Sequence, residues 1–88
     1  MKRNYDDKFY KEARAKSLKR DGRKCQMPGC GCKKRLQSHH IIPWSKSQAL
    51  RTEVDNLITL CRTCHESIKN REAHYVGLFT RIVQENKK

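Results

Sequence analysis

The sequence predicts an α+β fold in which two short strands and a helix lie between one helix near each end of the chain. Three observations support this fold class. Residues 5–20 lack Gly and Pro, two short apolar runs occupy the middle of the chain, and apolar residues recur at helical spacing near its end. Since 88 residues suffice for one domain and little more, we expect a single domain over residues 1–88.

The N-terminal helix is expected over about residues 5–20, where helix-forming residues predominate. Phe9, Ala13 and Ser17 share one face of this helix, and Lys and Arg residues cover much of the rest. Asp21-Gly22 follows directly, and glycine at this position typically ends a helix. The pattern predicts a basic helix that stops at residue 20.

The centre of the chain predicts two strands followed by a helix. Residues 36–44 are expected to form the first strand and the start of the loop that follows it. Residues 57–60 form an apolar run suited to the second strand. Between them, residues 46–51 have the spacing of a short capped helical turn. Residues 62–70 are expected to be helical.

The C-terminal helix is expected over about residues 71–85. Apolar residues repeat there at helical spacing, which predicts one buried face; they are Tyr75, Val76, Phe79, Ile82 and Val83. Packing against the rest of the domain is the preferred interpretation of this face, ahead of a surface for a partner.

Charge dominates the composition, with 21 Lys and Arg against nine Asp and Glu, a net charge of +12 and a pI near 9.9. A basic chain with few apolar residues is either disordered or a small cross-linked domain that binds a polyanion. No apolar stretch is long enough to span a membrane. The N-terminus lacks the apolar segment of a secretory signal, so we expect a cytoplasmic location and no membrane partner.

Five cysteines supply the cross-link that the composition requires. An odd number and a reducing compartment both disfavour disulfides. Cys25-x4-Cys30 and Cys61-x2-Cys64 form two chelating pairs, and four thiolates suit a structural Zn²⁺ ion. Cys32 could replace Cys30 in the first pair, and thiols that bind no metal are the alternative to a zinc site.

Two adjacent histidines, His39 and His40, end the first predicted strand. Neighbouring side chains on a strand point to opposite sides, so one histidine can hold a metal while the other meets a different partner. His65, in the first turn of the following helix, is a natural second ligand, although it could instead serve the zinc site. Asn56 could hydrogen-bond across the loop between the strands, or act only as a turn residue.

Together these segments resemble the HNH endonuclease family. The residues that carry the resemblance are His39-His40-Ile41-Ile42-Pro43, then Asp55-Asn56-Leu57-Ile58-Thr59-Leu60-Cys61, then Cys64-His65. The leading Arg20-Asp21-Gly22-Arg23-Lys24-Cys25, with Cys30, resembles the zinc-knuckle branch of that family. The resemblance covers roughly residues 19–69 and implies a small ββα-metal (HNH) core with a structural zinc knuckle over about residues 21–70, flanked by N- and C-terminal helices.

The resemblance also implies roles for single residues. His40 matches the general base that takes a proton from the attacking water, and His39 and His65 match the ligands of one catalytic divalent ion. Asn56 matches the asparagine that holds the loop and orients the base. The four cysteines Cys25, Cys30, Cys61 and Cys64 match the zinc ligands. Whether Mg²⁺, Mn²⁺, Ni²⁺ or Zn²⁺ serves as the catalytic ion stays open.

DNA is the expected partner, since Lys and Arg attract phosphates without reading sequence. We expect double-stranded DNA with weak sequence preference. The candidate backbone contacts are Lys33, Lys34, Arg35, Arg62, Lys69 and Arg71, with solvated charges as the alternative reading. In its small size the chain resembles the free-standing HNH proteins of phages and mobile elements. This resemblance implies a location in the cytoplasm of a phage-infected or bacterial host cell.

Two further functions stay open at this point. A non-catalytic zinc-knuckle module that binds DNA or RNA would share the zinc site and the basic charge but would not need His40. A nuclease subunit would take its target choice or activity from a larger protein partner. A single active site cuts one strand at a time, so double-strand cleavage would require a homodimer or two visits.

Overall fold

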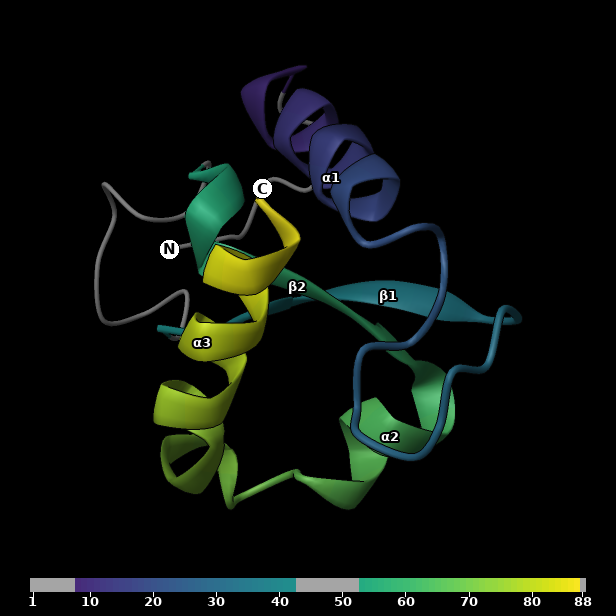
Figure 1. Cartoon of the computed structure of the whole chain (residues 1–88), viewed down its shortest axis with the longest axis vertical. Helices are drawn as coiled ribbons and strands as arrows, with labels where there is room; N and C mark the ends of the chain where they lie inside the picture. The colour runs from purple at the N-terminus through teal and green to yellow at the C-terminus, as the bar shows by residue number, and fades with distance from the viewer. Residues whose placement is uncertain (1–7, 43–52, 88) are drawn as a thin grey trace.

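The computed structural model describes residues 8–42 and 53–87, so the expected helical turn at 46–51 lies outside the described residues. The order of elements confirms the predicted α+β fold (Figure 1). They are α1 (Lys8–Arg20), β1 (Leu36–His40), the 3-10 turn η1 (Val54–Asn56), β2 (Leu57–Cys61), α2 (Arg62–Ser67), the 3-10 turn η2 (Glu72–Tyr75) and α3 (Val76–Asn86). Within the two described ranges, no helix has both the length and the apolar character needed to cross a bilayer.

The two strands form an antiparallel hairpin in which His39 lies opposite Ile58 and His40 opposite Leu57. On its other side, β2 is bonded to the segment after α1, because the Gln26 amide donates to the Thr59 carbonyl at 2.9 Å. In the described part of the chain, β1 pairs with β2 alone. One long edge of β1 is therefore available to form the wall of a cleft.

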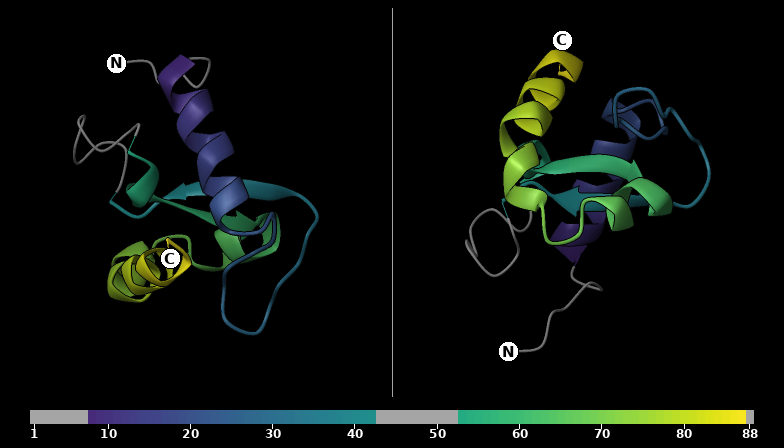
Figure 2. Two further views of the ribbon diagram at one scale, coloured as in Figure 1. Left: turned by 45° about the horizontal axis from the view of Figure 1, so that its top comes forward. Right: turned by 90° about the horizontal axis from the view of Figure 1, so that it is seen from below.

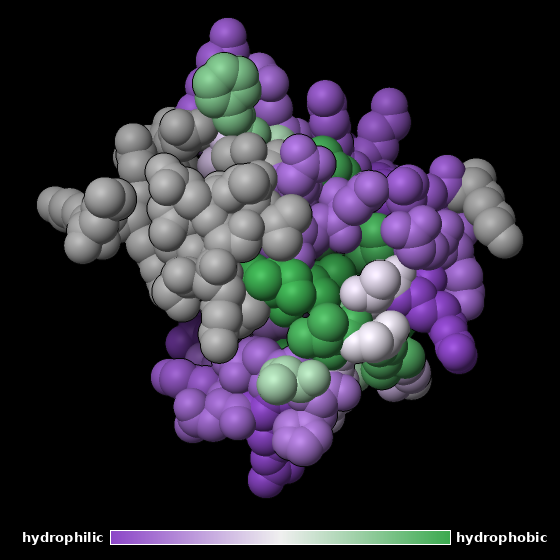
Figure 3. Space-filling model, turned by 90° about the vertical axis from the view of Figure 1, so that its left-hand side faces the viewer, coloured by the Kyte–Doolittle hydropathy of each residue, from purple (hydrophilic) through white to green (hydrophobic). Residues whose placement is uncertain are grey.

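The helices cover the hairpin from two sides. The left view of Figure 2 shows α1 on one face, with α2 and α3 on the other. The face with α2 and α3 holds the larger part of the core, in which Ile58, Leu60, Ile68, Phe79 and Val83 are buried. Figure 3 shows a central group of hydrophobic side chains bordered by hydrophilic ones. The predicted buried face of the C-terminal helix is confirmed, although its first turn, η2, is 3-10.

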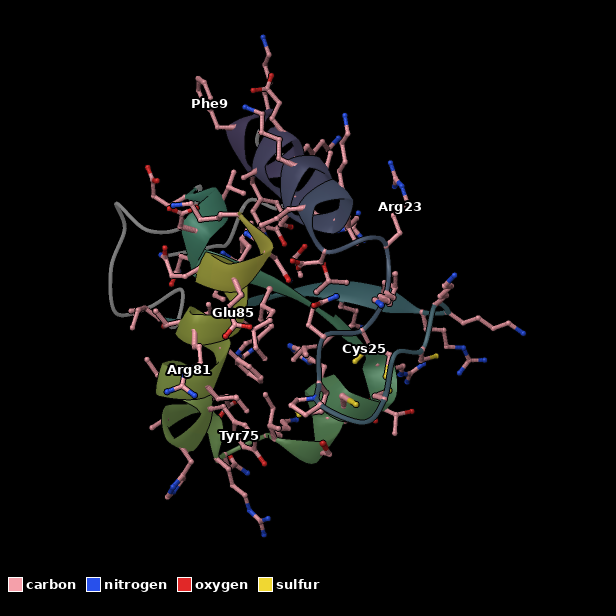
Figure 4. The ribbon with its side chains drawn as sticks, in the orientation of Figure 1. Phe9, Arg23, Cys25, Tyr75, Arg81 and Glu85 are labelled. Atoms are coloured by element: carbon pink, nitrogen blue, oxygen red, sulfur yellow. The ribbon has the colours of Figure 1, made fainter. Side chains whose placement is uncertain are left out.

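The α1 helix ends where the sequence predicts. The Gly22 amide donates to the Lys19 carbonyl at 3.1 Å, and the Arg23 amide donates to the Leu18 carbonyl at 2.9 Å. This pattern is a Schellman motif, and Gly22 adopts the left-handed conformation (φ 68°) that the motif requires. The buried face consists of Tyr10, Ala13 and Ser17. Phe9 instead projects from the helix and is 66% exposed (Figure 4).

Asp21 is the centre of a buried polar network that the sequence patterns do not predict. Its carboxylate accepts hydrogen bonds from the Arg20 guanidinium (2.8 and 2.9 Å), the Thr59 amide (2.9 Å) and the Asn86 side chain (3.0 Å). Arg20 also donates to the carbonyls of Val54 (2.8 Å) and Leu57. The network connects the end of α1 to the hairpin and to the end of α3. It therefore fixes α1 relative to the hairpin.

Replacing Asp21 by alanine should destabilise the protein strongly. The Arg20 and Asp21 side chains are 9% and 0% exposed, so the change leaves a buried guanidinium without its counter-charge. The expected loss in the free energy of unfolding is about 3–5 kcal/mol, measured by urea denaturation of zinc-loaded protein. Asp55→Ala is the matched control, because Asp55 and its partner Lys87 are 52% and 43% exposed, and such a pair contributes about 0–1 kcal/mol. Equal losses in the two variants would contradict this role.

Candidate functional site

Four cysteines converge at the junction of the knuckle loop, β2 and α2. The Sγ atoms of Cys25, Cys30, Cys61 and Cys64 all lie within 4.8 Å of one another. The sulfur atoms gather close to the labelled Cys25 in Figure 4. The Cys30 and Cys61 sulfurs are 3.8 Å apart, and the edge of a tetrahedron with Zn–S bonds of about 2.3 Å is about 3.8 Å. This group of four cysteines could hold zinc.

Backbone hydrogen bonds shape the loop that carries the first two cysteines. The Cys25 amide donates to the Cys32 carbonyl at 2.7 Å, and the Cys30 amide donates to the Met27 carbonyl at 3.0 Å. Gly31 follows Cys30 with a φ of 68°, which costs glycine little because it has no Cβ. The loop thereby turns Cys25 and Cys30 toward the hairpin.

The second pair of cysteines lies where β2 becomes α2. Cys61 is the last residue of the strand and the N-cap of the helix, and its sulfur accepts the Cys64 amide at 3.5 Å. This hydrogen bond lowers the pKa of the Cys61 thiol to about 7. Burial raises the pKa of the Cys25 and Cys64 thiols. A bound cation would offset that cost, because it favours the thiolate form at all four positions.

Cys32, the alternative to Cys30 that the spacing leaves open, lies outside this group. Its sulfur accepts the Lys34 amide at 3.5 Å and is exposed. The structure therefore brings Cys30, and not Cys32, together with the other three cysteines.

The rings of His39 and His65 meet edge to face between the hairpin and α2. Their ring centroids are 5.4 Å apart at an interplanar angle of 74°, and His39 also contacts Phe79 edge-on at 5.6 Å. Burial lowers the pKa of His39 to about 4, so its imidazole is neutral at pH 7. Its Nε2 is buried and has no hydrogen-bond partner among the described residues. A neutral imidazole with an unpartnered nitrogen can bind a metal ion, and His65 is placed to share it.

His40 lies on the opposite face of the hairpin, as the alternation of strand side chains predicts. Its ring stacks on Tyr10 of α1, with centroids 5.7 Å apart and an interplanar angle of 15°. Tyr10 is 7% exposed. A buried aromatic ring therefore restricts the orientation of the His40 imidazole.

Asn56 holds the chain just beyond His40. Its side-chain oxygen accepts the Ile42 amide at 2.8 Å, its side-chain nitrogen donates to the Ile42 carbonyl at 3.1 Å, and its backbone carbonyl accepts the Ile41 amide at 2.8 Å. Asn56 is 6% exposed. The hydrogen bond across the loop expected from the sequence is thus present, and it fixes the backbone where β1 ends.

A cleft of about 620 Å³ lies along the edge of β1. Its lining comes from three elements: Tyr10, Lys11 and Arg14 of α1, Gln37 and Ser38 of β1, and His65 of α2. Adjacent β1 residues line it, so the cleft wraps around the strand edge and reaches both faces of the hairpin. Sequence reasoning missed the α1 residues as site candidates. Helical spacing places Lys11 beside Arg14, but only the packing of α1 shows that this side meets β1.

The basic residues proposed from the sequence occupy other positions. All six are exposed, and in the described part of the chain none of them lines the cleft; they are Lys33, Lys34, Arg35, Arg62, Lys69 and Arg71. The structure brings two of them together, since the Arg62 amide donates to the Arg35 carbonyl at 2.9 Å. Arg62 also pairs with Glu66 at 3.3 Å on the exposed side of α2.

The β-hairpin, the helix that follows it and the four-cysteine group define a small α+β domain equipped to hold a metal ion. A model of the HNH endonuclease family matches residues 25–71, more than half of the 88-residue chain. The chain therefore belongs to the HNH endonuclease family, which confirms the resemblance inferred from the sequence. This membership indicates a nuclease-type function with nucleic acid as the partner. No match was found among curated proteins or among solved structures.

Proposed function

We propose that this protein is a metal-dependent endonuclease that hydrolyses phosphodiester bonds of DNA. His40 is the general base, and His39 and His65 hold one catalytic divalent ion. Cys25, Cys30, Cys61 and Cys64 hold a structural Zn²⁺ ion. Asn56 positions the base by holding the backbone at Ile42, two residues beyond it.

The close approach of the His39 and His65 rings, edge to face, is the observation that carries this proposal. Their centroids lie 5.4 Å apart, the His39 Nε2 is buried without a partner among the described residues, and His65 lines the cleft. An unpaired buried polar atom is costly unless a ligand satisfies it. A divalent ion would satisfy it, and with few protein ligands it would keep positions for phosphate oxygens and water.

The proposed reaction follows from the placement of the two histidines. A phosphodiester lying across the edge of β1 would have the His39–His65 pair on one side of the strand and His40 on the other. A ring nitrogen of His40 accepts a proton from water, whose oxygen bonds to phosphorus as the P–O3′ bond breaks. When bound, the divalent ion offsets the charge that develops on the phosphate and on the leaving oxygen. The leaving O3′ takes a proton from solvent water, so the products carry 5′-phosphate and 3′-hydroxyl ends.

A titration with divalent ions tests this function. Zinc-loaded protein without other divalent ions is mixed with supercoiled plasmid, and Mg²⁺, Mn²⁺ or Ni²⁺ is added in steps. We expect nicking to rise with at least one ion, while EDTA, which removes both metals, abolishes it. His65→Ala, checked for unchanged zinc at the cysteine site, should need at least about tenfold more of the same ion.

Two outcomes would contradict the proposal. Plasmid cutting that persists at full rate in EDTA would exclude a metal-dependent reaction. Plasmid binding without cutting under every ion tested would instead favour the non-catalytic zinc-knuckle module or a subunit that needs a partner. Mapping the cut ends on a sequencing gel distinguishes hydrolysis that leaves a 5′-phosphate from other reactions.

A further inference from the structure

The α1 helix adds a wall to the cleft that the family core does not contain. The family model matches residues 25–71, and α1 spans Lys8–Arg20, outside that match. The helix is nevertheless firmly seated on the hairpin. Tyr10 and Ala13 pack against the fully buried Leu57, and Arg20 bonds to carbonyls on either side of the start of β2. The helix therefore keeps a fixed position relative to β1.

Two cations project from α1 along the cleft. Lys11 and Arg14 lie one helical turn apart and both line it, together with His65 from the opposite wall. Arg14 is half-buried, and one of its guanidinium nitrogens donates to the Leu36 carbonyl at 3.4 Å. That bond directs the guanidinium along β1 and leaves further N–H donors for a ligand. Lys11 is exposed and contributes a second positive charge to the same wall.

The chemistry of this wall favours phosphate. The described residues that line the cleft comprise two cations, one histidine and three neutral polar side chains, with no carboxylate. Arg binds phosphate oxygens through paired N–H donors, and Lys binds them as a point charge. A phosphate held by Lys11 and Arg14 would share the cleft with His65.

We propose that α1 is a phosphate-binding wall, in which Lys11 and Arg14 bind the DNA backbone next to the bond that is cut. The placement of this phosphate next to a bond that is cut rests on the proposed function. The binding of the DNA backbone by Lys11 and Arg14 does not require catalysis. The wall holds the bound DNA strand against the edge of β1. The six exposed basic residues proposed from the sequence, Lys33, Lys34, Arg35, Arg62, Lys69 and Arg71, would then bind phosphates farther along the DNA.

A matched pair of double variants tests the wall. Lys11→Gln/Arg14→Gln removes two charges from the cleft side of α1. Lys16→Gln/Lys19→Gln removes two charges from the same helix at exposed positions that do not line the cleft. Both lower the net charge equally, so a difference between them reports position and not total charge. Fluorescence anisotropy of a short labelled DNA duplex, without divalent ions other than the structural zinc, measures binding at several salt concentrations.

The cleft variant should weaken binding about 30-fold at physiological salt and reduce the slope of log K against log salt by about 1.8. The control variant should change the affinity by less than about threefold, because exposed charges away from the DNA are screened. Lys11→Gln alone, at an exposed position, should reduce the slope by about 0.9. Zinc content and thermal unfolding confirm that each variant is folded.

Equal affinities and equal salt slopes in the two double variants would overturn the inference. This result is distinct from a failure of the proposed function. If the wild-type protein never cuts DNA but the cleft variant alone loses affinity, the phosphate-binding wall stands without the nuclease. If the wild-type protein cuts and both double variants bind and cut alike, the nuclease stands without the wall.

Discussion

Replacing Cys61 by serine is expected to abolish zinc binding and the folded state together. Cys61 is buried among the core residues, and its sulfur is one of four that lie within 4.8 Å of one another. In small zinc domains the free energy of metal binding, about 10–16 kcal/mol, is also free energy of folding. The core of this basic 88-residue chain is too small to replace it. Zinc content per chain and near-ultraviolet circular dichroism measure the two losses.

Cys32→Ser provides the matched control for this prediction. It makes the same chemical change one residue beyond Gly31, but the Cys32 sulfur lies outside the four-cysteine group. The Cys32 variant should keep its zinc and unfold at the wild-type temperature. Cobalt(II) substitution adds a direct readout, because thiolate ligands give charge-transfer absorption that weakens when one sulfur is lost. Wild-type zinc content in Cys61→Ser, or loss of zinc in Cys32→Ser, would contradict the assignment.

Local patterns in the sequence predict most of the elements of this fold. The Gly22 stop of α1, the extended conformation of each strand and the buried face of α3 each depend on residues within a few positions of one another. Alternation along a strand similarly predicts that His39 and His40 lie on opposite faces, where they contact His65 and Tyr10 respectively. Such features follow from the backbone conformation of a short segment, which sets the direction in which each side chain points.

The features that the sequence does not predict depend on contacts between distant residues. Asp21 reads as part of a helix stop, yet it bonds to Asn86, 65 positions away. Cys30 and Cys32 have similar spacing from Cys25, and only the turn of the folded loop separates them. Lys11 and Arg14 belong to the basic surface predicted for the first helix, but only the packing of α1 places them beside β1. Periodicity shows which residues share a face, but not which element that face meets.

His40→Ala is expected to stop DNA cleavage while leaving the fold, zinc binding and DNA binding intact. His40 is half-buried at the end of β1, and its ring contacts Tyr10 and not the cysteine group. The backbone there stays anchored by the bonds between Asn56 and Ile42, which the substitution does not touch. Removal of a general base typically lowers the rate about 100- to 10,000-fold. A module that only binds DNA would show no such loss.

The most direct test of the nuclease is the rate of the first nick in supercoiled plasmid, measured with protein in excess. Wild type, His40→Ala and His74→Ala are compared at one concentration of the divalent ion that supports cutting, after zinc content and DNA affinity are matched. His74 is exposed on η2 and serves as the histidine control. We expect wild type and His74→Ala to nick at similar rates and His40→Ala to be at least about 100-fold slower. Nicking by His40→Ala at the wild-type rate would contradict the proposed mechanism.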